Sequence, residues 1–154
     1  MEFGQLLRTM TDAACAGDGD GVAACFTPHG VYHDVFYGAF SGRDRIAEMI
    51  RNYFHRDATD FRWDIHHPVS DGETGYAHYV FSYASKLAGH EGRRTVFEGV
   101  AMVRLEGGLI AHYAEIANTL PALQRLGFGS ERLLRICERQ GRLLSVRDDV
   151  RDHL

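Results

Sequence analysis

The chain has few cysteines, only one lysine and no long apolar run, and these shortages exclude several classes of protein. Its 154 residues include 17 basic and 21 acidic side chains. The basic side chains are 16 arginines and one lysine, and they are scattered along the sequence, so a nucleic-acid-binding surface is not indicated. Cys15, Cys25 and Cys137 form neither a CxxC pair nor a metal-binding spacing with histidine, and each falls in an apolar pattern typical of a buried, reduced thiol.

Targeting, membrane and cofactor motifs are also missing. The first ten residues, MEFGQLLRTM, are amphipathic and acidic at Glu2, unlike a secretory signal. No segment approaches the roughly 20 apolar residues of a membrane span, so we expect a cytoplasmic protein with no membrane partner. The GxSxG elbow, the Walker loop, the dinucleotide glycine motif and the HExxH and His-x-His spacings are absent, and we expect no cofactor and no metal site.

The first half of the chain predicts two helices, a strand and a third helix within one domain. Apolar residues recur at helical spacing from Phe3 to Ala14, and after the break AGDGDG a second short helix is expected over residues 22–26. A strand follows from Gly30 through Tyr37. The segment SGRDRIAEMIRNYFHRDA then restores helical spacing, with Ser41 or Gly42 as the expected cap.

From residue 61 the apolar period changes to two, which predicts four successive strands. The segments are FRWDIHHPV, GYAHYVFSYASKL, RTVFEGVAMVRL and LIAHYAEIA. The short turns SDGE and EGG favour antiparallel hairpins. Pro121 suits the start of a helix, and the last 25 residues predict an amphipathic helix of mixed charge. We expect that helix to cover the domain or to pack on a partner subunit.

Two segments resemble the SnoaL-like branch of the nuclear transport factor 2-like superfamily: FTPHGVYHDVFYGAFSGRDRI and GGLIAHYAEIANTLPALQRLGF. The resemblance implies an α+β fold of the cystatin-like kind, in which a curved antiparallel or mixed β-sheet forms a cone around the N-terminal helices. This domain is expected over residues 1–128, with a helical extension over residues 129–154. The resemblance also implies a largely apolar pocket, commonly in homodimers, but the fold hosts many activities.

Asp34, within VYHDV, is the first candidate catalytic residue. It matches the position at which ketosteroid isomerases of this superfamily hold their proton-shuttling carboxylate. Burial in an apolar cavity raises the pKa of a carboxyl group and makes it a usable base near neutral pH. The alternative is that Asp34 only accepts hydrogen bonds from backbone amides. Steroid isomerisation itself is disfavoured, because the first helix has no tyrosine and Ala101 replaces the second aspartate of those enzymes.

Glu115 is the second candidate. It falls where the limonene epoxide hydrolases of the superfamily carry an aspartate in their last strand, although Asn118 replaces a second acid there. The arginine and aspartate partners of those enzymes are not visible in YVFSYASKL. Glu115 is therefore either an acid or base of the site, or a carboxylate paired with an arginine near the rim of the pocket.

Two histidines are candidate partners for Asp34. Dehydratases and cyclases of the superfamily use a histidine and an aspartate from different strands, and Asp34 with His78 or His67 is the corresponding arrangement. Because side chains alternate along a strand, His66 and His67 lie on opposite faces, and only one of His78 and Tyr79 faces the cavity. A structural or exposed role is the alternative for each histidine.

Aromatic residues on the predicted elements supply the bulk of a pocket or of an ordinary core. The candidate ligand-binding residues are Tyr32, Tyr53, Trp63, Phe81 and Tyr113, and Tyr32 is expected to orient the ligand. Such a pocket suits a flat hydrophobic molecule such as a polyketide, a terpenoid or a steroid-like compound.

The sequence thus leads to two hypotheses. In the first, a cofactor-independent protein binds a small hydrophobic molecule and acts on it as an isomerase, cyclase or dehydratase, with Asp34 as base and His67, His78 or Glu115 as partner acid. In the second, the same fold is a non-catalytic module for ligand binding or dimerisation, and its acids are structural. An open cavity onto which Asp34 and a second titratable group converge distinguishes the first from the second.

Overall fold

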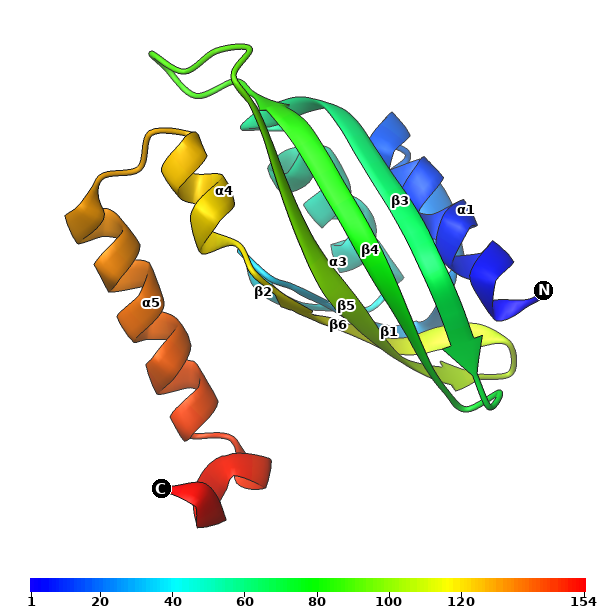
Figure 1. Cartoon of the computed structure of the whole chain (residues 1–154). Coiled ribbons are helices and arrows are strands. Elements are labelled where there is room, and N and C mark those ends of the chain that lie inside the picture. The colour runs from blue at the N-terminus through cyan, green and yellow to red at the C-terminus, as the bar shows by residue number, and fades with distance from the viewer.

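A curved sheet of six strands forms the body of the protein, and the N-terminal helices pack against one of its faces (Figure 1). The computed structural model describes all residues from 1 to 154. The elements up to the middle of the chain are α1 (Phe3–Ala16), α2 (Gly19–Ala24), β1 (Phe26–Asp34), β2 (Gly38–Ser41), α3 (Arg43–Met49) and β3 (Ala58–Ser70). The remaining elements are β4 (Thr74–Ser85), β5 (Arg94–Glu106), β6 (Leu109–Ala117), α4 (Leu120–Arg125) and α5 (Ser130–Ser145).

The order of strands across the sheet is β2, β1, β6, β5, β4, β3. Neighbouring strands are antiparallel except β1 and β6, which are parallel and bring Tyr32 opposite Tyr113. The chain therefore returns from the last hairpin to lie beside its own first strand. This mixed, open sheet with N-terminal helices confirms the predicted α+β class and the four predicted C-terminal strands.

The core lies between the sheet and the helices. The apolar stripe of α1 is buried through Leu6, Leu7, Met10 and Ala14, as its helical spacing predicts. Burial of each large aliphatic side chain contributes about 1.5 to 3 kcal/mol to folding. Helix α1 packs against β3, so this burial ties the helix to the inner face of the sheet.

The predicted strand from Gly30 through Tyr37 is wrong at both ends. Strand β1 begins earlier, at Phe26, and ends at Asp34; a turn over residues 35–37 then leads into β2, which pairs antiparallel with β1. Strand β2 carries no recognisable sequence pattern, because it has only four residues. The predicted third helix is also divided, since α3 is followed by a π-helical turn over Ile50–Phe54.

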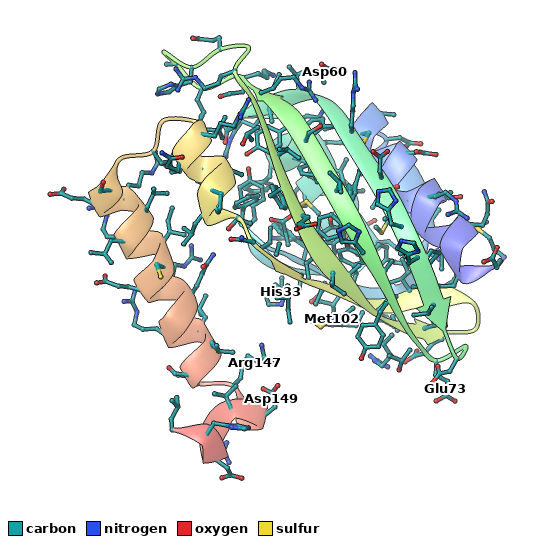
Figure 2. All side chains as sticks on the ribbon, viewed as in Figure 1. His33, Asp60, Glu73, Met102, Arg147 and Asp149 are labelled. Atoms are coloured by element: carbon teal, nitrogen blue, oxygen red, sulfur yellow. The ribbon has the colours of Figure 1, made fainter.

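Helix α5 follows α4 and extends beyond the sheet (Figure 1). None of its residues is fully buried. A 3-10 helix over Asp148–His153 ends the chain, and there Arg147 and Asp149 form an ion pair (Figure 2). Neither α5 nor any other helix combines the length and apolarity that a membrane span requires.

Candidate functional site

A cavity of about 410 Å³ opens between the inner face of the sheet, the turn after β1, and helices α4 and α5. Aromatic side chains dominate its walls: Phe36, Phe54, Phe61, Trp63, Phe81, Tyr83 and Phe97. Several of these rings touch edge to face, as Trp63 and Phe81 do with centroids 5.0 Å apart. The volume falls in the range of small-molecule pockets, and the walls suit an apolar, ring-containing ligand.

Asp34 lines this cavity and also fixes the turn that follows β1. Its Oδ1 accepts hydrogen bonds from the backbone N–H groups of Phe36 at 2.8 Å and Tyr37 at 2.9 Å. Its Oδ2 has no hydrogen-bond partner in the protein. Burial raises the pKa of Asp34 above its ordinary value, and the two amide hydrogen bonds partly oppose that rise. The structural and the catalytic interpretation of Asp34 therefore concern different oxygens of one carboxyl group. Oδ1 holds the turn, and Oδ2 is the oxygen that could accept a proton.

Glu115 is the second carboxyl group on the cavity wall. Its Oε1 accepts from the Tyr113 hydroxyl at 2.7 Å and its Oε2 accepts from the Tyr79 hydroxyl at 3.0 Å. Burial, followed by the nearby Asp34 carboxylate, raises the pKa of Glu115 to about 8, although both tyrosine hydrogen bonds act in the opposite direction. Glu115 keeps some accessible surface, and that surface faces the cavity it lines. At neutral pH its carboxyl group is mostly protonated.

The parallel pairing of β1 with β6 explains why these two acids meet. Tyr32 lies opposite Tyr113 across the two strands, with ring centroids 4.8 Å apart. Asp34 and Glu115 each follow two residues later, so they occupy the same face of adjacent strands, whose backbones run about 4.8 Å apart. At that spacing each carboxylate opposes the ionisation of the other.

Two polar atoms of the cavity wall have no partner in the protein. The Tyr32 hydroxyl and the Trp63 indole nitrogen are both buried without a hydrogen bond. Leaving such a group unpaired costs about 1 to 3 kcal/mol, which a hydrogen bond to a ligand offsets. Burial and the nearby Glu115 and Asp34 charges hold the pKa of Tyr32 well above its usual value, so its hydroxyl stays protonated.

A glycine makes room for Tyr79 beside Glu115. Tyr79 pairs with Gly99 across β4 and β5. A Cβ atom at Gly99 would lie 2.6 Å from the Tyr79 hydroxyl oxygen and 2.8 Å from the carbonyl oxygen of Ile116. A Cβ atom is essentially never found this close to another heavy atom. The hydrogen bond from Tyr79 to Glu115 therefore depends on the absence of a side chain at position 99.

The structure does not place His78 in the cavity. His78 lies on the outer face of β4, where its Nε2 is 2.8 Å from an oxygen of the exposed Glu98. Met102 projects from the outer side of β5 and marks this face (Figure 2). The inward positions of β4 belong to Tyr79 and Phe81. The structure therefore does not bring His78 together with Asp34.

His67 is also exposed and outside the cavity, although strict alternation from Trp63 and Ile65 would turn it inward. The register of β3 against β4 shifts between His66 and Val69, and His67 has a φ of 50°. This β-bulge breaks the alternation and turns His67 away from the cavity. The structure therefore does not bring His67 together with Asp34 on the cavity wall.

The predicted ligand-binding residues divide into two groups. Tyr32, Trp63 and Phe81 line the cavity. Tyr53 does not; it packs between the rings of Tyr37 and Phe40. Tyr113 is fully buried beside the cavity and acts on it only through its hydrogen bond to Glu115.

Two parts of the site escaped the sequence analysis. Strand alternation alone allows either His78 or Tyr79 to face the cavity, and the alternation of large residues through Tyr79, Phe81 and Tyr83 is the signal that decides for Tyr79. The contribution of α5, which brings Arg132 and Arg139 to the cavity, had no signal because no local pattern shows where that helix packs. No group of three or more histidine, cysteine or acidic side chains is arranged to hold a metal ion.

Comparison with known families identifies the class to which this fold and site belong. The model of the SnoaL-like domain matches residues 7–113. The chain therefore belongs to the SnoaL-like family. A search of curated proteins gives no match.

Solved structures share the fold at low sequence identity. A protein of ketosteroid isomerase-like fold from Catenulispora acidiphila, crystallised with trimethylamine, has a TM-score of 0.73 and 15% identity, over 82% of this chain and 95% of that one. An epoxide hydrolase of the limonene epoxide hydrolase-like type from M. tuberculosis has a TM-score of 0.63 and 18% identity, over 88% and 94%. A proposed polyketide cyclase from Xanthomonas campestris has a TM-score of 0.63 and 19% identity, over 79% and 94%. These likenesses show the fold alone.

Proposed function

We propose that this protein is an enzyme that transfers protons on a small, apolar carbonyl compound bound in the cavity. The observation that carries the proposal is the meeting of Asp34 and Glu115 on one aromatic cavity wall, where Glu115 has a pKa of about 8. Two acids in such environments share their charge: near neutral pH one is ionised and the other is protonated. A base and an acid then face the same ligand.

Asp34 is the base in this proposal. Two backbone amides hold its Oδ1 and favour the ionised form, while Oδ2 is free to accept a proton. Removal of a proton from the carbon next to a carbonyl group leaves an enolate, whose negative charge moves to the carbonyl oxygen. In an isomerisation, Asp34 returns the proton to the far carbon of a C=C bond conjugated with the enolate, and the double bond shifts. In a cyclisation, the enolate carbon bonds to a second carbonyl carbon, the C=O π bond there breaks, and the resulting alkoxide takes the proton back from Asp34.

Tyr32 and Glu115 are the groups that stabilise the enolate oxygen. The Tyr32 hydroxyl has no partner in the protein, and a protonated Glu115 has an O–H of its own to donate. Preorganised donors of this kind typically contribute about 3 to 4 kcal/mol each to lowering the barrier. Trp63 offers a further unpaired N–H on the same wall.

Epoxide hydrolysis fits these residues less well. Glu115 is held by two tyrosines, and no arginine contacts it. The arginines of the cavity wall are Arg56, on the turn before β3, and Arg132 and Arg139, on α5. An arginine between two carboxylates, which would position a water molecule for attack on an epoxide, is thus not assembled around Glu115.

Deuterium exchange tests the reaction class without knowledge of the product. The protein is incubated in D₂O with a panel of cyclic, apolar ketones, and loss of the α-proton signals is followed by NMR. We expect catalysed exchange for some ketones with the wild type, loss of that exchange in Asp34→Asn, and unchanged exchange in His78→Ala, which alters an exposed side chain away from the cavity. Ligand binding without exchange in any ketone would instead support a non-catalytic binding module.

A further inference from the structure

The outer end of the cavity is basic, in contrast to its acidic inner end. Helix α5 presents Arg132, Ile136, Arg139, Gln140 and Leu143 to the cavity. Arg132, Ile136, Arg139 and Leu143 follow one another at three or four residues, and Gln140 lies four residues after Ile136, so all five lie on one side of the helix. Two arginines on this side thus face the space in which a ligand lies.

Neither of these arginines has an acidic partner. No carboxylate oxygen lies within 4.0 Å of the guanidinium group of Arg132 or Arg139, whereas Arg56, the third arginine of the wall, forms an ion pair with Asp57 at 3.0 Å. The Arg132 guanidinium lies over the ring of Phe128, with its central carbon 3.8 Å from the ring centroid. This stacking orients Arg132 and leaves its N–H donors free.

The inner end of the cavity repels negative charge. Asp34 and Glu115 lie there, and a second anion beside them would raise the cost of ionising either acid. An anionic group on a ligand therefore has one favourable position, next to the arginines of α5. An apolar body then fills the aromatic middle of the cavity, and its reacting end meets Asp34.

We infer that the substrate is an amphiphile: an apolar, ring-containing body that carries a carboxylate or phosphate at the end remote from the reacting carbon, bound by Arg132 and Arg139. Arginine matches the planar, two-oxygen geometry of such groups. This inference rests on the proposed function, because both place the ligand in the same cavity. It adds the chemical class of the substrate and the orientation in which the substrate lies in the cavity.

Two fluorescent probes test the inference directly, because they share one ring system and differ by one charge. Anilinonaphthalene sulfonate carries an anionic sulfonate, and N-phenylnaphthylamine lacks it. Trp63 is the only tryptophan of the chain and lies in the cavity wall, so quenching of its fluorescence reports either probe. Competition between the probes shows whether they share one site.

We expect the wild type to bind the sulfonate more tightly than the neutral probe. The double variant Arg132→Gln and Arg139→Gln should weaken sulfonate binding by about 5- to 30-fold and leave the neutral probe within about 2-fold, because each exposed charge pair accounts for up to about 1 kcal/mol. The double lysine variant, which keeps both charges, should recover part of the loss. The matched control is Arg135→Gln with Arg142→Gln, on the same helix but outside the cavity wall.

Three results would overturn the inference. Equal binding of the two probes, with no effect of the glutamine variants, would show that the cavity takes apolar ligands without regard to charge and would leave the proposed function standing. An equal loss in the Arg135 and Arg142 control would show a general effect of surface charge. Failure of both probes to quench Trp63 or to compete would remove the cavity as a ligand site and with it the proposed function.

Discussion

Replacing Glu115 with glutamine is expected to change how the stability of the protein depends on pH. Burial holds the pKa of Glu115 at about 8 in the folded protein, against an ordinary value of 4.5. Between these two values the folded state keeps a proton that the unfolded state has lost. The free energy of unfolding therefore falls as pH rises through this window, and the fall is complete once pH exceeds the folded pKa.

The magnitude follows from the difference between the two pKa values. Each pKa unit corresponds to about 1.4 kcal/mol, so ionising Glu115 in place lowers the free energy of unfolding by up to about 5 kcal/mol between pH 4.5 and pH 8. Asp34, whose pKa is also raised, adds to the fall with the same sign. Glutamine has the shape of the protonated acid, and its carbonyl oxygen still accepts from one tyrosine, so the variant loses only the Glu115 contribution.

Urea unfolding at pH 5, 6, 7 and 8, followed by Trp63 fluorescence, measures this effect. The stability of the wild type should fall more steeply with pH than that of Glu115→Gln, and the variant should be the more stable protein at pH 8, by roughly 2 to 5 kcal/mol. Glu91→Gln is the matched control, because Glu91 is an exposed acid in the loop between β4 and β5 with no hydrogen-bonded partner. Parallel pH profiles for wild type and Glu115→Gln would refute the account of Glu115 as a buried, protonated acid.

Five further substitutions, at four positions, separate structural from chemical roles. Asp34→Asn keeps an oxygen for the two turn amides and should fold within about 1 kcal/mol of wild type, whereas Asp34→Ala should lose about 1 to 3 kcal/mol in urea unfolding; both should lose deuterium exchange. Tyr32→Phe should leave stability unchanged or slightly higher, because it removes an unpaired buried hydroxyl, while lowering the exchange rate by about 100- to 1,000-fold. His78→Ala, which breaks a hydrogen bond with the exposed Glu98, should alter stability by no more than about 1 kcal/mol and leave the exchange rate at the wild-type value. Gly99→Ala should displace Tyr79, cost about 1 to 3 kcal/mol in urea unfolding and impair exchange; full stability in this variant would contradict the close packing around position 99.

Local patterns predicted most of the fold. The helical spacing of α1 and the twofold periodicity of β3 to β6 correspond to burial that the structure shows, because each pattern reflects one face packed on a common core. The same alternation indicates the face on which Tyr32 and Asp34 lie. Asp34, Glu115 and three of the five aromatic ligand candidates accordingly line one cavity.

Non-local geometry decided the rest of the site. The parallel pairing of β1 with β6 places Glu115, rather than a histidine, beside Asp34, and no short segment of sequence encodes that pairing. The position of His67 depends on a single bulge, because one extra residue in a strand reverses the faces of all residues beyond it. The arginines of α5 reach the cavity through the path of the chain after α4, which local periodicity does not describe.

The central claim is that Asp34 and Glu115 share one negative charge on the wall of a cavity that a ligand enters. NMR titration of the side-chain carboxyl carbons, with and without N-phenylnaphthylamine, tests it most directly. The account predicts that Glu115 titrates near pH 8, that this step is absent from Glu115→Gln, and that both carboxyl signals move when the probe binds. Two carboxyl groups that titrate at their ordinary values and do not respond to the probe would contradict the claim.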